Sequence, residues 1–335
     1  MSSDYGYINA RVRGMKAKLL GPEFFTEALG AAEFRSFMTA LSQSPYQQNI
    51  EEAQASYEGL KALDAALARN FYGTARSILN FTDGTPHDIV ALLLLRYDLN
   101  NLKAIARAKH AGRSAEDTQE VFFPAGTLKP AVLENVASAP DMAGAAQVLL
   151  TTPTPLRGAF ARAAQSYSSD GDLYALELAL DRAYYKEIAQ ALKELDIPKD
   201  FARYLRREID ATNLRTALQM RGNDVQADEL FVSGGREINR GIFEGILNDP
   251  AGGLQSLSNT SFSQVAEVEP GEVAGVVREL LDSAAKRLSG DPLGVGVVVN
   301  YLRQKEAESA KLRLLARGKY YGVPRETLAK ELGDA

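Results

Sequence analysis

The chain has 335 residues, enough for two average domains or three small ones. Hydrophobic residues make up 45% and charged residues 24% of the sequence, which is ordinary for a folded globular protein and excludes a wholly disordered chain. The longest apolar run, Ile89 to Leu95, is far shorter than the roughly 20 residues that span a bilayer. No charged stretch leads into an apolar one at the start, so we expect no signal peptide and retention in the cytosol.

Side chains suited to catalysis or metal binding are scarce. The sequence has no cysteine, which excludes disulfides, thiolate nucleophiles and cysteine metal sites, and it has no tryptophan. Its only histidines are His87 and His110. The net charge of −5 is mild and gives no reason to expect a nucleic acid partner. Composition therefore favours a structural or binding role.

Helical periodicity dominates the chain. Within residues 57–72 and again within residues 173–192, apolar residues recur at spacings of three and four, which predicts one apolar face on each of two helices. The best strand candidate, Val295 to Val299, leads directly into a long helical pattern. We therefore predict an all-α fold. The two apolar stripes are Leu60, Leu63, Leu67 and Phe71, and Leu173, Leu176, Leu180, Tyr184, Ile188 and Leu192.

The two stripes belong to an internal repeat. LKALDAALARNFY, from residue 60, matches LYALELALDRAYY, from residue 173, at an offset of 113 residues. Downstream, Pro86 and Pro198 each open a segment that reaches an aspartate 12 residues later, and proline suits the first turn of a helix. The motifs that follow are Asp98 with Asn101-Leu102-Lys103, and Asp210 with Asn213-Leu214-Arg215.

A fainter third copy completes the pattern. Pro292 opens a segment in which Glu308 stands where the aspartates stood, followed by Lys311. Three hydroxyl-containing turns fit the same period. A period of about 110 residues is too long for solenoid turns and indicates repeated domains. We predict three similar helical domains in a pseudo-threefold arrangement, residues 1–115, 116–228 and 229–335. The turns are Ser44-Pro45-Tyr46, Thr154-Pro155-Leu156 and Thr260-Ser261-Phe262.

These features carry a resemblance to a known family. The opening run from Tyr5 to Lys16 (YGYINARVRGMK), the threefold repeat and the Asp-x-x-Asn-Leu-basic helices occur together and in order. The sequence resembles the C subunit of the prokaryotic V/A-type rotary ATPase, whose eukaryotic counterpart is the d subunit of the vacuolar proton pump. The resemblance covers essentially the whole chain.

The resemblance implies a funnel-shaped protein of three similar helical domains around a central cavity. It implies a peripheral position on the cytoplasmic face of the membrane proteolipid ring, a socket for the central stalk, and torque transmission that couples proton transport to ATP synthesis or hydrolysis. It implies no catalytic, cofactor-binding or metal site, no small-molecule substrate and no nucleic acid. An alternative stays open: an all-helical scaffold or regulatory adaptor unrelated to ion pumps.

Polar motifs are interpreted as structural. Asp98 with Asn101, and Asp210 with Asn213, lie three residues apart on one helix face, and no histidine or carboxylate cluster nearby completes a metal site. We expect buried polar contacts between helices, with Arg206 or Arg207 as candidate partners of Asp210. Both histidines are assigned solvent-facing or capping roles. The glycine-rich stretch at 234–253 lacks a phosphate-binding motif and is assigned to loops and helix ends.

Basic residues gather near both ends of the sequence. Two interpretations stay open: a solvated face, or contact with acidic partner loops or anionic lipid headgroups, worth about 1 kcal/mol per basic residue near a membrane. The residues are Arg11, Arg13, Lys16 and Lys18, and Lys311, Arg313, Arg317, Lys319 and Arg325.

Overall fold

The computed structural model describes residues 5–114, 117–118, 123–221, 226–269 and 271–334. All regular secondary structure in those ranges is helical, which confirms the predicted all-α class. Within the same ranges, none of the helices combines the length and the apolar character that a membrane span requires.

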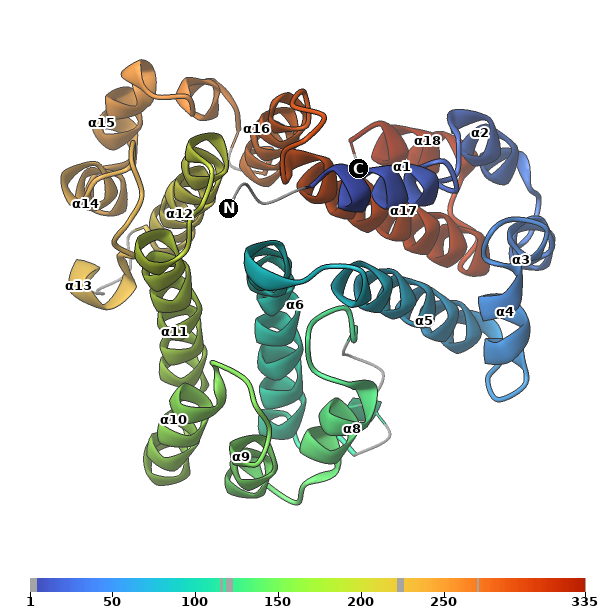
Figure 1. Ribbon diagram of the computed structural model, residues 1–335, viewed down its shortest axis with the longest axis horizontal. Helices are drawn as coiled ribbons and strands as arrows, with labels where there is room; N and C mark the ends of the chain where they lie inside the picture. Colours follow the sequence, from blue (N-terminus) through green and yellow to red (C-terminus); the bar gives the residue numbers. More distant parts are fainter. Residues whose placement is uncertain (1–4, 115–116, 119–122, 222–225, 270, 335) are drawn as a thin grey trace.

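Six helices of 16 or more residues form the framework of the described ranges, and they follow one another in consecutive pairs (Figure 1). The pairs are α5 (Gly59–Asn80) with α6 (Gly84–His110), α11 (Leu173–Glu194) with α12 (Lys199–Met220), and α16 (Val273–Leu288) with α17 (Gly296–Tyr320).

Shorter helices precede, separate and follow the pairs. The first group is α1 (Gly6–Lys16), α2 (Pro22–Gly30), α3 (Phe34–Ser42) and α4 (Gln47–Gln54). The second is α8 (Pro130–Ser138), α9 (Met142–Leu150) and α10 (Arg157–Asp170). The third is α13 (Ala227–Leu230), α14 (Arg240–Asn248), α15 (Pro250–Gln255) and the 3-10 turns η1 (Ser256–Asn259) and η2 (Ser263–Glu267). Helix α18 (Arg325–Asp334) ends the described chain.

Among the described residues, buried apolar side chains form three clusters. The largest joins α6 and α8–α11 to parts of α1, α5, α12 and the start of α17, and Leu94 and Phe160 are among its fully buried members. A second joins α3, α4 and α5 to the end of α17, and a third joins α12 to α14 and α16. Each cluster therefore contains long helices packed against the short ones.

The two ends of the chain share one cluster. Leu312 and Leu315 of α17 are buried with Phe37 and Leu41 of α3, and α18 packs on α2 (Figure 1). The domain boundaries near residues 115 and 228 stay a prediction, and residues 115–116, 119–122 and 222–225 of the expected breaks lie outside the described residues.

Local structure agrees with the repeat found in the sequence. Helices α5 and α11 have the same length of 22 residues, and Leu67 and Leu180 are buried at matching positions. The strand candidate Val295 to Val299 instead forms the N-cap and the first four residues of α17. All five residues are buried, which explains an apolar run that lacks helical periodicity.

The three hydroxyl-containing turns are equivalent, as predicted. In each one, a serine or threonine hydroxyl accepts a hydrogen bond from the amide two residues later, and that later residue is fully buried. The amide-to-hydroxyl distances are 3.2 Å for Tyr46–Ser44, 3.4 Å for Leu156–Thr154 and 3.1 Å for Phe262–Thr260.

Candidate functional site

Asp98 of α6 joins its helix to the loop that leads into α8. The carboxylate accepts hydrogen bonds from the Thr127 amide at 2.8 Å, the Thr127 hydroxyl at 2.7 Å and the Leu128 amide at 3.1 Å. Burial raises the pKa of Asp98 to about 6, although these hydrogen bonds oppose the rise. A Cβ on Gly126 would lie 1.9 Å from the carboxylate, so the close approach requires glycine.

Asp210 of α12 makes the equivalent contact between its helix and a following loop, and we call each such carboxylate-centred contact a joint. Its carboxylate accepts hydrogen bonds from the amides of Arg236, Glu237 and Ile238, all at 3.0 Å. A Cβ on Gly235 would lie 2.1 Å from the same carboxylate. The predicted burial is confirmed, but the expected arginine partner is wrong, because a loop that turns its amides toward the carboxylate already satisfies it.

Asn101 and Asn213 clamp the same loops one helical turn further on. Asn101 donates to the carbonyl of Phe123 at 2.7 Å and accepts from its amide at 2.6 Å. Asn213 makes the same two bonds with Val232, at 2.8 and 2.9 Å. The Asp-x-x-Asn motif therefore holds a following loop through its backbone.

Glu308 of α17 occupies the third position with different partners. It accepts hydrogen bonds from the Leu20 amide and the Tyr46 hydroxyl, both at 2.6 Å, and from Lys305 Nζ at 2.7 Å. The Lys305 ammonium also lies 4.3 Å from the centre of the Tyr46 ring. Burial lowers the pKa of Lys305, although Glu308 opposes this change. This joint connects the last long helix to the N-terminal segment.

Lysines cap neighbouring helices near two of the three joints. Lys109 Nζ donates to the carbonyls of Ala137 and Ala139 at the end of α8, and Lys319 Nζ donates to those of Leu29 and Ala31 at the end of α2. Each lysine lies eleven residues after its joint carboxylate, Asp98 or Glu308. Sequence reasoning missed this role, although the shared spacing was available.

A charged hub lies where α6, α12 and α17 meet. Arg96 pairs with Glu306 at 2.5 Å and lies 3.8 Å from Glu208, which in turn lies 3.8 Å from Arg303. Tyr204 donates to Glu208 at 2.7 Å and accepts from Arg303 at 3.2 Å. Arg96, Glu208 and Glu306 each stand two residues before a joint carboxylate, so equivalent positions of the repeat meet at the hub.

The hub is partly shielded from solvent. Arg303 and Glu208 have side chains 11% and 14% exposed, whereas Glu306 is 48% exposed. Burial raises the pKa of Tyr204, and Glu208 raises it further, so the tyrosine hydroxyl keeps its proton and donates. Burial lowers the pKa of Arg96, but Tyr97, Glu306 and Glu208 together raise it above its ordinary value. The hub therefore keeps its arginine charge and ties three helices together.

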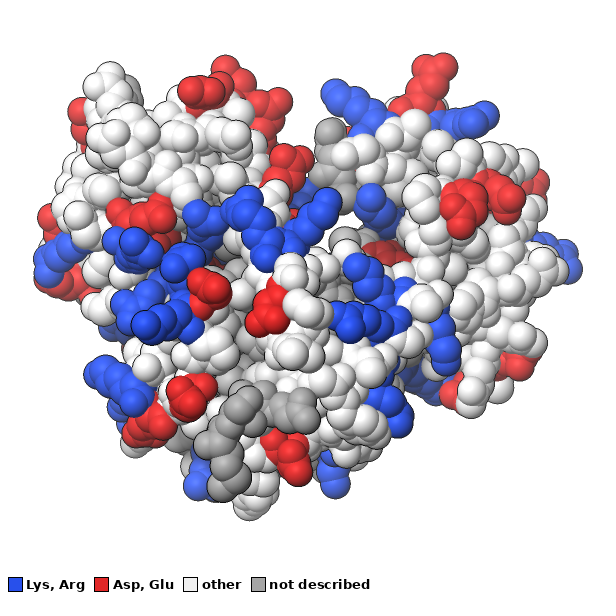
Figure 2. All heavy atoms as spheres, turned by 45° about the horizontal axis from the view of Figure 1, so that its top comes forward, with Lys and Arg blue, Asp and Glu red and all other residues white. Residues whose placement is uncertain are grey.

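The N-terminal basic cluster is exposed. Arg11 donates to the Tyr7 hydroxyl and lies over the Phe81 ring, and Arg13 donates to the Pro292 carbonyl. Lys16 and Lys18 are exposed. On the face drawn in Figure 2, many lysine and arginine side chains form a band across the middle, beside a hollow.

The C-terminal basic cluster is used mainly within the fold. Arg313 and Arg317 both pair with Asp64, at 2.9 and 3.5 Å, and Arg313 also lies over the Phe123 ring. Lys319 caps α2 as described above. The N-terminal cluster is therefore the more available for an external contact.

The histidines lie at the two ends of α6. His87 is near its start, with Nδ1 3.6 Å from Asp88, and His110 at its end pairs with the Tyr167 hydroxyl at 2.8 Å. Across the described ranges, no group of three or more histidine, cysteine or acidic side chains could hold a metal ion.

The profile of the ATP synthase (C/AC39) subunit family matches residues 8–331. The chain belongs to this family. It is similar to the C subunit of the V-type ATP synthase of Deinococcus radiodurans, with 37% identity over 99% of this chain and 92% of the relative. The same subunit of the Thermus thermophilus V-type enzyme is also 37% identical, over 99% of both chains. The C subunit of the A-type ATP synthase of Haloferax volcanii is 25% identical, over 97% of this chain and 96% of the relative.

Membership of the C/AC39 family confirms the resemblance to the C subunit of V/A-type ATPases. The chain is a subunit of a rotary ATP synthase complex and has partner subunits in it. The joints at Asp98, Asp210 and Glu308 and the charged hub all lie within the matched residues.

Proposed function

We propose that this chain is the non-catalytic rotor subunit that links the central stalk to the membrane proteolipid ring. It transmits torque between the ATP-hydrolysing head and the ring, and so couples proton transport to ATP synthesis or hydrolysis. It sits peripherally on the cytoplasmic face and corresponds to the eukaryotic d subunit. The observation that carries the proposal is the match to the ATP synthase (C/AC39) family along almost the whole chain.

The charged hub and the buried joints support a mechanical role. A torque-transmitting part must move as one body, and close-packed interiors have low compressibility. The hub ties α6, α12 and α17 to one another through Arg96, Glu208 and Arg303. The joints at Asp98, Asp210 and Glu308 fix each of these helices to a loop or terminal segment through buried hydrogen bonds.

The shape that we propose is a funnel of three similar domains in pseudo-threefold arrangement. Equivalent residues of the repeat meet at the hub, which supports such an arrangement. The hollow and its band of basic side chains support a seat for the stalk on the face drawn in Figure 2. The exposed N-terminal cluster of Arg13, Lys16 and Lys18 is the candidate contact with acidic loops of a partner subunit.

The decisive experiment is a pull-down of the tagged full chain from membranes solubilised under conditions that keep the proteolipid ring intact. We expect recovery of central-stalk subunits together with a small, very hydrophobic proteolipid, identified by mass. Recovery of soluble proteins alone would contradict the rotor role and favour the adaptor alternative.

A charge reversal tests the N-terminal contact separately. We expect the triple substitution Arg13→Glu, Lys16→Glu and Lys18→Glu to leave the helical fold intact and to weaken co-purification with the partner complex. The matched control reverses three exposed lysines elsewhere, Lys129, Lys193 and Lys199, which should leave co-purification unchanged. Equal recovery of both triple variants would remove the N-terminal cluster from the interface.

A further inference from the structure

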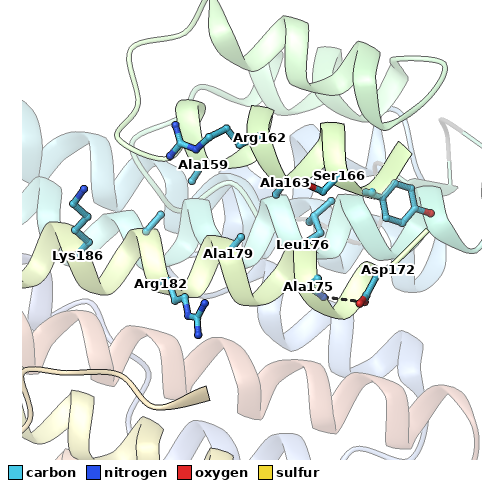
Figure 3. Close-up of a pocket in the computed structure, with 12 residues that line it drawn as sticks. Ala159, Arg162, Ala163, Ser166, Asp172, Ala175, Leu176, Ala179, Arg182 and Lys186 are labelled. Carbon is cyan, nitrogen blue, oxygen red and sulfur yellow. Dashed lines mark hydrogen bonds between the residues drawn. The ribbon is translucent and has the colours of Figure 1, made fainter. Parts of the chain in front are cut away.

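A long groove runs between α10 and α11, with a volume of about 410 Å³ (Figure 3). Small side chains on both helices leave it open, and those on α11 are half-buried or exposed. From Asp172 to Lys186 the groove follows about four turns of α11, or roughly 21 Å. The alanines that line it are Ala159 and Ala163 of α10, and Ala175, Ala179 and Ala183 of α11.

The groove lies beside the single face that α11 buries. Of its 22 residues, Leu176, Leu180, Tyr184 and Ile188 are buried, and the helix packs on α10 and α6. The equally long α5, its repeat partner, buries nine residues. Helix α11 therefore keeps more of its surface uncovered than the helix it repeats.

Charges on α11 are separated by side. The carboxylates of Glu177 and Asp181 are bound by Arg107 and Lys103 of α6, at 2.6 and 2.8 Å. Lys186 lines the groove, and within the described residues it has no hydrogen bond or ion pair. These two carboxylates are thus already paired with cations of α6, whereas Lys186 in the groove has no such partner among the described residues.

Arg162 of α10 lies near Lys186 at the same end of the groove (Figure 3). It is exposed and, in the described part of the chain, has no ion pair either. The opposite end holds Tyr167 and Asp172, and the Asp172 carboxylate caps α11 by accepting from the Ala175 amide at 2.9 Å. The groove is therefore basic at one end and holds a helix-capping carboxylate at the other.

We infer that this groove docks an amphipathic helix of a neighbouring subunit that carries carboxylates at one end. The length and alanine lining fit the ridge of a packed helix better than a compact anion, because larger side chains on one helix fill grooves on another. Its carboxylates pair with Arg162 and Lys186, and its apolar ridge covers Ala179 and Ala183. The inference rests on the proposed function, which supplies the neighbouring subunits.

Photo-crosslinking in the assembled complex tests the occupant. We would replace Gln190, which is exposed one helical turn beyond Lys186 and does not line the groove, with p-benzoylphenylalanine in the full chain and irradiate the purified ATP synthase. The expected result is an adduct with one segment of another subunit, identified by mass as an acidic helix. An adduct with lipid, or none in complexes that contain this chain in full amount, would overturn the inference.

Affinity measurements test the charges. We would measure binding of the purified chain to the complex isolated from cells that lack it. Arg162→Glu with Lys186→Glu should weaken binding at least tenfold, whereas Lys193→Glu on the same helix, outside the groove, should change it less than twofold. Ala179→Phe, which fills the groove without changing charge, should also weaken binding at least tenfold.

The outcomes separate the two proposals. Wild-type affinity in both groove variants would overturn the docking site and leave the rotor role standing. Failure of the wild-type chain to bind central-stalk and ring subunits would instead contradict the proposed function itself.

Discussion

The joints at Asp98 and Asp210 differ from the joint at Glu308 in what satisfies a buried carboxylate. At the first two, the donors belong to a loop that follows the long helix within 30 residues, and nearly all are backbone amides. At Glu308, one amide comes from Leu20, 288 residues away, and the other donors are the side chains of Tyr46 and Lys305. The same position of the repeat thus satisfies its buried carboxylate in two chemically different ways.

The difference follows from chain connectivity. At α17, the partners of the carboxylate come from residues 20 and 46, which precede the helix, and from the helix itself, rather than from a loop that follows it. A single amide cannot neutralise a buried carboxylate, and a lysine supplies the missing positive charge at the cost of desolvating both ions. The third joint therefore closes the chain on itself and depends on an ion pair, whereas the first two depend on backbone geometry.

Breaking the ion pair should have the largest effect. Glu308→Gln leaves the Lys305 ammonium buried without its counter-charge, so we expect the free energy of unfolding to fall by about 3–5 kcal/mol. Denaturant unfolding measures the loss, and hydrogen exchange at residues 17–24 should show that it begins at this joint. The double variant Lys305→Met with Glu308→Gln should recover most of the stability. If it instead lost as much as the two single variants added together, the two residues would not interact as a pair.

Removing the Asp210 carboxylate should cost somewhat less, about 3–4 kcal/mol. Asp210→Ala leaves the amides of Arg236, Glu237 and Ile238 without an acceptor, and each buried unsatisfied donor costs about 1–3 kcal/mol before the loop relaxes toward water. Hydrogen exchange should quicken at residues 236–238. The control is Asp200→Ala on the same helix, which removes only an exposed pair with Arg203 and should change stability by less than about 1 kcal/mol.

Asp98 adds a pH dependence. Its pKa is about 6 in the folded chain, against an ordinary 3.8, so the folded state binds this proton more tightly than the unfolded state between these values. The contribution of Asp98 to stability should therefore fall by about 3 kcal/mol in total as pH rises from about 3 to about 7, with most of the loss between about pH 4 and 6. The difference between wild type and Asp98→Asn in unfolding free energy, measured across this range, isolates the effect. A difference that does not change with pH would contradict the raised pKa.

The sequence predicted the positions of the joints better than their partners. The common spacing to Asn101 and Asn213 marked Asp98 and Asp210 as buried polar residues, and alignment of the third copy placed Glu308 beside them. The amide donors could not be predicted, because any residue supplies the same backbone group and only the loop conformation aims it. Leu20 and Tyr46 could not be predicted as partners of Glu308 for another reason, since no local spacing connects them to a helix near the other end of the chain.

The helical class and the α5/α11 repeat were predictable for a related reason. They depend on contacts within a few helical turns, such as the stripe through Leu63 or Leu180, and residues close together in the sequence are enough to show this periodicity. The charged hub was not predicted, because its members come from three helices. Arg96, Glu208 and Glu306 occupy equivalent repeat positions, but one is an arginine and two are glutamates, so the alignment alone gave no sign that they meet.

The smallest effect we predict is steric and compares three glycines next to the joints. Gly126→Ala would place a Cβ 1.9 Å from Asp98, and Gly235→Ala one 2.1 Å from Asp210; both carboxylates are short, buried and held by amides. The loop must move away, and we expect a loss of about 2 kcal/mol at each. Gly21→Ala beside the third joint also meets a carboxylate at 2.1 Å, but this belongs to exposed Glu23, which can swing into solvent. In thermal unfolding, the melting temperature of Gly21→Ala should therefore stay close to that of wild type. An equal loss in all three variants would mean that general loop strain requires glycine, and not the close approach to a fixed carboxylate.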